Sequence, residues 1–260
     1  MLGLTSMQPH PSYRQVGVRV SAVQIPEVIA IVEEWIANHG QAQYIAVAGM
    51  HGMTEAQADP EFKVILNHAG LVVPDGMPLV WLARYHGIKL KRRVYGPELM
   101  LSFCEATAKK GYRHFFYGGV DGVAPLLADK LQNRFPGLVV AGTYTPPFRP
   151  LSKEEELEVA TLIAQTRPDI LWVGLSTPKQ EKWMYHHRHL PVAVMVGVGA
   201  AYDFNTGRIK QAPKWMQEHG LEWCFRLLVE PRRLWRRYLL QGPKFIFYVL
   251  SEISGLRKFD

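Results

Sequence analysis

Apolar residues along the chain follow two patterns, short continuous runs and longer stretches with helical spacing. Residues 24–38 carry Val28, Val32 and Trp35 on one helical face, whereas residues 44–48 form an uninterrupted apolar run. Repeated along the chain, these patterns predict strands at 44–48, 71–73, 114–117, 138–141, 170–173 and 192–196. They predict helices at 24–38, 59–67, 77–86, 97–110, 120–135 and 178–187, and another that begins at Ser152 with a capping box.

Short apolar strands separated by amphipathic helices are typical of a parallel sheet that is covered on both faces. We therefore expect an α/β, Rossmann-like catalytic domain over residues 14–204, with its ligand site at the carboxyl ends of the strands. No strand signal follows Tyr202, and the remaining apolar residues have helical spacing. Residues 205–260 are expected to form a helical appendage. Residues 1–13 lack the features of a signal peptide and are expected to form a flexible N-terminal arm.

Composition excludes several classes of protein. A hydrophobic content of 48% is too high for a disordered chain. Two cysteines are too few for a disulfide scaffold. Cys104 and Cys224 have no C-x-x-C pair and no histidine at zinc-ligand spacing, which argues against a structural metal site, and both are expected to be buried apolar residues. The longest apolar run, residues 190–202, is shorter than the ~20 residues of a membrane-spanning helix.

Positive charge is concentrated at the C-terminal end of the chain. Residues 205–260 contain eleven basic and five acidic residues, a net charge of +6 out of +7 for the whole chain. Such a segment favours a polyanionic partner, either nucleic acid, an anionic lipid surface or a diphosphate.

Asp75 follows a predicted strand in the sequence Val-Pro-Asp-Gly. A carboxylate at this place can project into the cleft and act as a general base, because the glycine lets the backbone turn. Alternatively, Asp75 caps the helix that begins at Met77, and the spacing by itself favours the cap.

Two further strand ends carry groups suited to an anion. Gly118 and Gly119 form a turn whose backbone N–H groups could bind phosphate, with an ordinary tight turn as the alternative. Lys179 and Gln180 lie in the first turn of a helix, where a lysine opposes the helix dipole and an anionic ligand would explain it.

Three weaker features complete the candidate site. Arg92 and Arg93 precede a helix and are either phosphate ligands or an exposed, solubilising pair. His51 follows a strand and points towards the predicted cleft, although a lone histidine is more often structural. The Gly197-x-Gly199 turn matches the dinucleotide fingerprint poorly and favours close packing of a helix on a strand.

Five segments carry a resemblance to a known family. They are VVPDG, RVYGPEL, FFYGG, PDILWVGLSTPKQEKW and the long stretch from YDFNTGRIKQ to LWRRYL. Together, in this order from about Val18 to Leu240, they resemble the WecG/TagA/CpsF glycosyltransferases, which are N-acetylmannosaminyltransferase-like enzymes.

The resemblance implies an inverting, metal-independent enzyme without a cofactor. It would move a sugar from a UDP-sugar to a polyprenyl-diphosphate-linked saccharide in the synthesis of a cell-surface polysaccharide. Asp75 would be the general base, and Arg93 and Gln180 would line the site. The C-terminal arginines would hold the lipid diphosphate; they are Arg226, Arg232, Arg233, Arg236 and Arg237.

One loop departs from the family pattern. Where many members have Thr-x-Asn, this chain has Val47-Ala-Gly-Met-His51, so His51 is expected to take over part of that role. We expect Gly118, Gly119, Arg93 and Lys179 to stabilise the departing UDP.

The resemblance and the basic appendage together predict a cytoplasmic protein bound peripherally to the anionic inner face of the membrane, with no nucleic-acid partner. Apolar residues near the tail leave open a subunit interface in a homo-oligomer. Two other functions remain at this point: a non-catalytic module that binds membranes or polyanions through residues 205–260, and an NAD(P)-dependent oxidoreductase.

Overall fold

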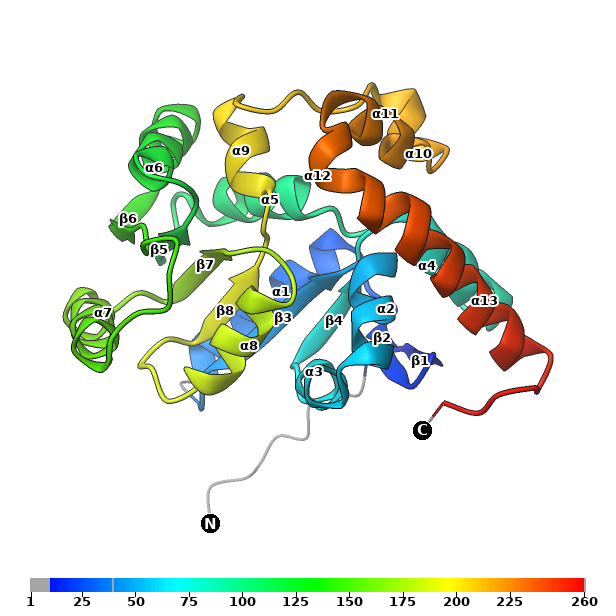
Figure 1. The fold of residues 1–260 in the computed structure, drawn as a ribbon. Helices are drawn as coiled ribbons and strands as arrows, with labels where there is room; N and C mark the ends of the chain where they lie inside the picture. Colours follow the sequence, from blue (N-terminus) through cyan, green and yellow to red (C-terminus); the bar gives the residue numbers. More distant parts are fainter. Residues whose placement is uncertain (1–9, 39, 260) are drawn as a thin grey trace, which may run out of the picture.

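The computed structural model describes residues 10–38 and 40–259 and is built around a six-stranded parallel sheet (Figure 1). The strand order is β4-β3-β8-β7-β5-β6, and every neighbouring pair is parallel. The sheet confirms the expected α/β class. Its strands are β3 (Gln43–Ala48), β4 (Leu71–Pro74), β5 (Arg113–Gly118), β6 (Val139–Tyr144), β7 (Ile170–Gly174) and β8 (Val194–Gly197).

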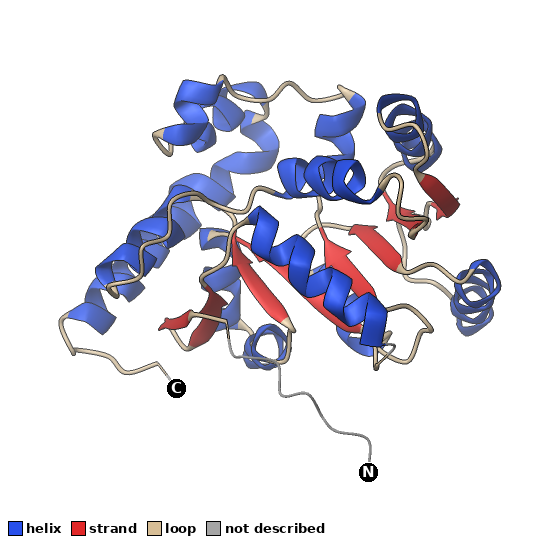
Figure 2. Cartoon of the chain, turned by 180° about the vertical axis from the view of Figure 1, so that it is seen from behind, coloured by secondary structure: helices blue, strands red, loops and turns tan. Residues whose placement is uncertain are grey.

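Helices cover both faces of the sheet (Figure 2). One face packs against α1 (Ile25–Asn38), α5 (Gly96–Thr107), α6 (Val123–Arg134) and α9 (Ala201–Thr206). The other packs against α2 (Met50–Ala58), α3 (Pro60–Asn67), α4 (Met77–Tyr85), α7 (Lys153–Thr166) and α8 (Lys179–His186). Cys104, on α5, is buried as expected, whereas Cys224 is only partly buried.

The hydrophobic pattern did not predict helix α2 or an N-terminal hairpin, β1 (Ser12–Gln15) and β2 (Val18–Ser21). Residues 1–9 of the predicted arm lie outside the described residues, but Ser12 and Tyr13 belong to β1, and Tyr13 is buried. Val16 and Gly17 form the hairpin turn with φ of 45° and 76°. Because the turn lacks the usual Asn-Gly or Asp-Gly pair, the sequence gives little signal for it.

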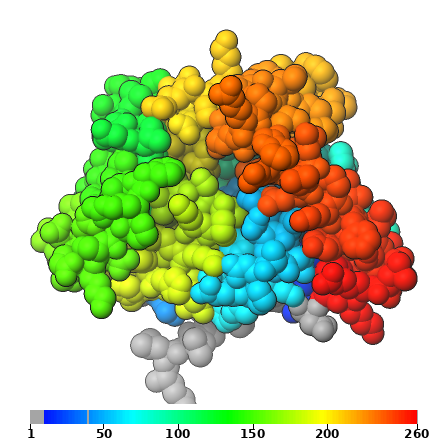
Figure 3. Space-filling view, viewed as in Figure 1, coloured from blue at the N-terminus to red at the C-terminus, as the bar shows by residue number. Residues whose placement is uncertain are grey.

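The residues after α9 form a helical appendage, as predicted. It comprises α10 (Lys214–Glu218), α11 (Glu222–Val229), α12 (Pro231–Trp235), the π-helical segment η1 (Arg236–Gln241) and α13 (Gly242–Ile253). The last three are continuous and run along one side of the molecule (Figures 1 and 3). No helix within the described residues is long and apolar enough to cross a membrane.

The appendage packs firmly on the α/β layers. Phe245 and Val249 of α13 belong to the same buried cluster as the helices on that face of the sheet. At the far end of α13, both carboxylate oxygens of Glu252 accept the Val16 N–H, at 3.0 and 2.9 Å, and Gln15 donates to the same carboxylate. These contacts hold α13 against the helices on that face of the sheet and against the N-terminal hairpin.

Candidate active site

Asp75 lies at the carboxyl end of β4, where its own N–H donates to the Ala48 carbonyl at the end of β3 (2.9 Å). The cap of α4 is Gly76, with φ of 129°, and no side chain in the described part of the chain caps this helix. The alternative in which Asp75 caps the helix is therefore wrong. Its Oδ1 atom is instead buried, with no hydrogen-bond partner among residues 10–38 and 40–259.

Four charged side chains surround the Asp75 carboxyl, and one of them comes from the α/β domain. Burial raises the pKa of Asp75 to about 6, and the positive charges of Arg93, Arg237 and Arg226 oppose that rise, whereas Glu222 adds to it. A pKa near the working pH suits a general base, because the carboxylate is ionised at neutral pH and can still accept a proton efficiently.

Arg93 joins the α/β domain to the appendage. Its Nη2 lies 2.5 Å from Glu222 Oε2, and it also donates to Gln217 Oε1 at 3.1 Å. Its guanidinium carbon is 4.1 Å from the centre of the Tyr95 ring. Arg93 is thus not an exposed, solubilising residue, and its partners hold it beside Asp75.

Arg226 and Arg237 enter the site from the appendage. Both line a cavity of about 820 Å³ that also contains Asp75, His51 and Arg93. The Nε of Arg226 is buried without a hydrogen-bond partner in the described parts of the chain. A buried guanidinium nitrogen and a buried carboxylate oxygen, both without a hydrogen-bond partner among the described residues, indicate a place prepared for a polar ligand.

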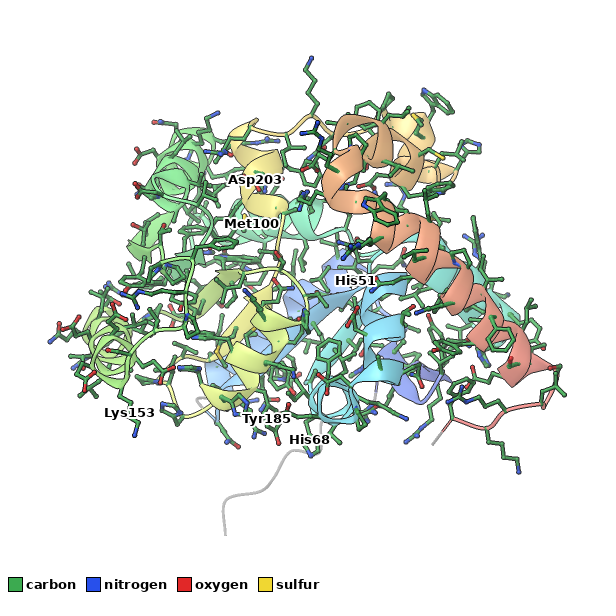
Figure 4. The ribbon with its side chains drawn as sticks, viewed as in Figure 1. His51, His68, Met100, Lys153, Tyr185 and Asp203 are labelled. Atoms are coloured by element: carbon green, nitrogen blue, oxygen red, sulfur yellow. The ribbon has the colours of Figure 1, made fainter. Side chains whose placement is uncertain are left out.

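His51 occupies the first turn of α2, at the end that faces the appendage (Figure 4). Its Nδ1 hydrogen-bonds Gln241 Oε1, and Gln241 in turn donates to Glu55. Burial and, next, the charge of Arg237 lower the pKa of His51, which keeps the ring neutral at pH 7. His51 lines the cavity as predicted, and it contributes hydrogen bonding there without positive charge.

Gly118 and Gly119 do not line this cavity. The Gly119 N–H donates to the Gly174 carbonyl (3.0 Å), and a Cβ at Gly118 would lie 2.6 Å from that same oxygen. Gly118 therefore allows β5 to approach β7 closely, which favours the tight-turn alternative. Their role in binding phosphate stays a prediction, and the Gly119 N–H is already engaged.

Lys179 and Gln180 are adjacent but lie in different surroundings. Lys179 is exposed, with its ammonium 5.5 Å from the Phe148 ring, outside the cavity. Gln180 is buried; it donates to Glu181 Oε1 (2.9 Å) and leaves its own Oε1 without a partner within the described residues. A Cβ at Gly197 would lie 3.0 Å from Gln180 Nε2, so the Gly197-x-Gly199 turn makes room for this side chain.

Comparison with known proteins decides the family. Residues 13–258 match the glycosyl transferase WecG/TagA/CpsF family, which is almost the whole chain. The chain belongs to this family of glycosyl transferases. It is 32% identical over 230 residues to an N-acetylglucosaminyldiphosphoundecaprenol N-acetyl-beta-D-mannosaminyltransferase of Bacillus spizizenii, covering 88% of this chain and 87% of the relative. A Bacillus subtilis protein of the same name is 32% identical over 202 residues, covering 77% of this chain and 76% of the relative.

Membership in this family settles the class of the protein: the chain is a glycosyltransferase, and the oxidoreductase and the non-catalytic module are set aside.

The five candidate arginines of the transferase's appendage separate into two groups. Arg226 and Arg237 line the cavity with Asp75, whereas Arg232, Arg233 and Arg236 are exposed and do not line it. The sequence did not distinguish the two groups because both occur in one basic stretch.

Sequence reasoning missed two acidic residues of the transferase. Glu222 was counted only as an acidic residue of the tail, yet it is buried against Arg93. Glu181 is buried beside Gln180 and Thr177, whose hydroxyl donates to it at 2.8 Å, and burial raises the pKa of Glu181. The only available signal was position, since both residues lie inside segments that carry the family resemblance.

We expect the Glu222→Gln substitution to destabilise the transferase by about 3 kcal/mol, because it leaves Arg93 buried without its partner. The loss of stability should lie at the low end of the range for a broken buried ion pair, because the negative charge of Asp75 remains beside Arg93. Urea unfolding followed by circular dichroism measures it. Glu230→Gln is the matched control, since its exposed pair with Arg233 should contribute less than about 1 kcal/mol. Equal losses in the two variants would show that the buried pair contributes no more to the free energy of unfolding than the exposed pair does.

Proposed function

We propose that this transferase moves a sugar from a UDP-sugar to a polyprenyl-diphosphate-linked saccharide, with inversion at the anomeric carbon. The names of the two Bacillus relatives support an N-acetylglucosamine-diphosphoundecaprenol acceptor and transfer of N-acetylmannosamine. The observation that carries the proposal is the buried Asp75 carboxylate, whose Oδ1 has no hydrogen-bond partner among the described residues, beside Arg93, Arg226 and Arg237.

In the proposed reaction, the acceptor hydroxyl loses its proton to Asp75 while its oxygen attacks the anomeric carbon of the donor. The bond from that carbon to the UDP oxygen breaks, and its electron pair leaves with the diphosphate. Guanidinium groups in a buried site are suited to stabilise the charge that develops there. Arg93, Arg226 and Arg237 are our candidates for binding the donor and acceptor diphosphates.

We propose that the reaction needs no metal ion. Within residues 10–38 and 40–259, no group of three His, Cys, Asp or Glu side chains is arranged to hold one. The fixed arginines are our candidates for the positive charge that a metal ion supplies in other enzymes.

We further propose that the exposed face of the appendage contacts an anionic membrane, at the inner face of the cytoplasmic membrane. Arg232, Arg233 and Arg236 are exposed there, and so are Leu228 and Leu240. Basic residues near an anionic leaflet contribute about 1 kcal/mol each, so this face would bind the membrane reversibly.

The experiment is to measure UDP release from a panel of UDP-sugars with a short-chain GlcNAc-diphospholipid, with and without EDTA. We expect acceptor-dependent release from UDP-N-acetylmannosamine, at a rate that EDTA changes by less than about twofold, because fixed cations replace the metal. Release that EDTA abolishes and Mg²⁺ restores would contradict metal independence. Absence of release from every donor would contradict the UDP-sugar assignment.

A further inference from the structure

The site cavity continues as an apolar groove between α4 and α13. Trp81, Leu82 and Tyr85 of α4 form one wall, and Ile246, Leu250 and other α13 residues form the opposite wall. The polar end of the groove lies at Asp75, since α4 begins two residues after Asp75. The far end lies at Ile253, about 16 Å along α13 at 1.5 Å per residue.

Both walls leave large apolar side chains uncovered. Tyr85 is 63% exposed, Leu250 59%, Ile246 56% and Trp81 49%. Scattered exposed apolar residues are ordinary, but here four of them line one continuous groove that opens from a charged site. The arrangement indicates an elongated apolar ligand that covers them when it binds.

The charge at the polar end of the groove identifies the kind of ligand. Arg93, Arg226 and Arg237 gather there and outnumber the two acidic residues at this end, Asp75 and Glu222. The residues of α4 and α13 that line the groove are all uncharged, and the charged Arg84 and Glu252 of these helices do not line it. A ligand that matches both ends has a strongly anionic head joined directly to a long apolar chain. A prenyl diphosphate has this form, and guanidinium groups are well suited to its phosphate oxygens.

We propose that the groove between α4 and α13 binds the first part of the acceptor's prenyl chain, with the diphosphate at the three arginines. This inference rests on the proposed function, because it takes the lipid-linked acceptor as its starting point. The groove gives the chain a path from the reacting sugar to the surface of the molecule, so that the enzyme recognises the lipid as well as the saccharide.

The test is calorimetric binding of farnesyl diphosphate and of inorganic diphosphate to the full-length protein without membranes. We expect farnesyl diphosphate to bind at least about tenfold more tightly, because even a few buried methylene groups account for that factor, and to bind with a negative heat-capacity change. Leu250→Glu should weaken farnesyl diphosphate binding by at least about tenfold, since it places a charge in the apolar groove.

Phe247→Glu is the matched control. Phe247 is on the same helix and is 64% exposed, but it does not line the groove, so this variant should bind farnesyl diphosphate like the wild type. Equal affinity for the two diphosphates, or equal weakening by the two glutamates, would overturn the proposal.

A second measurement distinguishes this proposal from the proposed function. The KM for GlcNAc-diphosphate acceptors is compared between a methyl and a farnesyl chain, in solution. A lower KM for the farnesyl acceptor, lost in Leu250→Glu, supports the groove. Transfer with the same KM for both chains would overturn the groove and leave the transferase function intact. Tight farnesyl diphosphate binding without any transfer would support the groove and contradict the function.

Discussion

Replacing Asp75 with asparagine is expected to slow sugar transfer by about 10²–10⁴-fold, the usual contribution of a general base. The amide has nearly the same shape as the carboxyl group but cannot accept the proton of the acceptor hydroxyl. In the wild type, the rate should rise with pH through about 6 and level off above it, because burial raises the pKa of Asp75 to about 6. Initial rates between pH 5 and 8 measure both effects.

The same substitution is expected to stabilise the folded protein at pH 7, by about 1–3 kcal/mol. The pKa of Asp75 is higher in the folded protein than its ordinary value of 3.8, so the folded state binds the proton more tightly than the unfolded state. Asp75 therefore favours folding below pH 4, and this contribution is lost as pH rises to about 6. Asparagine has no charge at any pH, so the Asp75→Asn protein does not lose this stability as the pH rises.

Asp129→Asn is the control, because Asp129 is an exposed carboxylate on α6. It should change neither the rate nor the free energy of unfolding. An Asp75→Asn protein that is folded and retains the wild-type rate would contradict the assignment of Asp75 as the base. An Asp75→Asn protein that is less stable than the wild type at pH 7 would contradict the conclusion that burial raises the pKa of Asp75.

Arg226→Ala and Arg237→Ala are each expected to lower kcat/KM for the acceptor by about 10–100-fold, which is the range for a lost hydrogen bond to a charged group. Both side chains line the cavity with Asp75, and the Nε of Arg226 is buried without a partner in the described segments. Steady-state rates with a short-chain acceptor in solution measure the change.

Arg232→Ala provides the contrast. Arg232 is exposed on α12 and does not line the cavity, so in solution its substitution should alter kcat/KM by less than about twofold. On anionic vesicles it should weaken binding of the protein, because it removes one of the outward charges. Equal losses for Arg232 and Arg237 in solution would contradict the division into inward and outward arginines.

Local patterns predicted the α/β layers because a strand that is buried between two helical layers has apolar residues at nearly every position. Strands such as Ile170–Gly174 are continuous apolar runs, and α7 begins with the capping box expected at Ser152. The N-terminal hairpin has no such local pattern in its sequence. Its buried Gln15 is polar and is partnered by Glu252, 237 positions away in the chain, which no local pattern can predict.

The same limit applies to the candidate site. Asp75 and His51 could be placed near the cleft from their positions after strands, and Arg93 was a candidate because it precedes a helix. Their grouping with Arg226 and Arg237 depended on the family resemblance and on how the appendage folds back. Glu222 and the apolar groove along α13 depend entirely on that packing. Gly118, Gly119 and Lys179 fitted an anion site by local criteria, yet they lie outside the cavity.

Mass spectrometry of the acceptor after incubation with UDP-N-acetylmannosamine tests the central claim most directly. The wild-type protein, in EDTA, should add one N-acetylhexosamine to a GlcNAc-diphospholipid and release one UDP for each acceptor converted, whereas Asp75→Asn should form little product in the same time. An acceptor of unchanged mass with every UDP-sugar, from a protein that is folded and binds the lipid, would contradict the account.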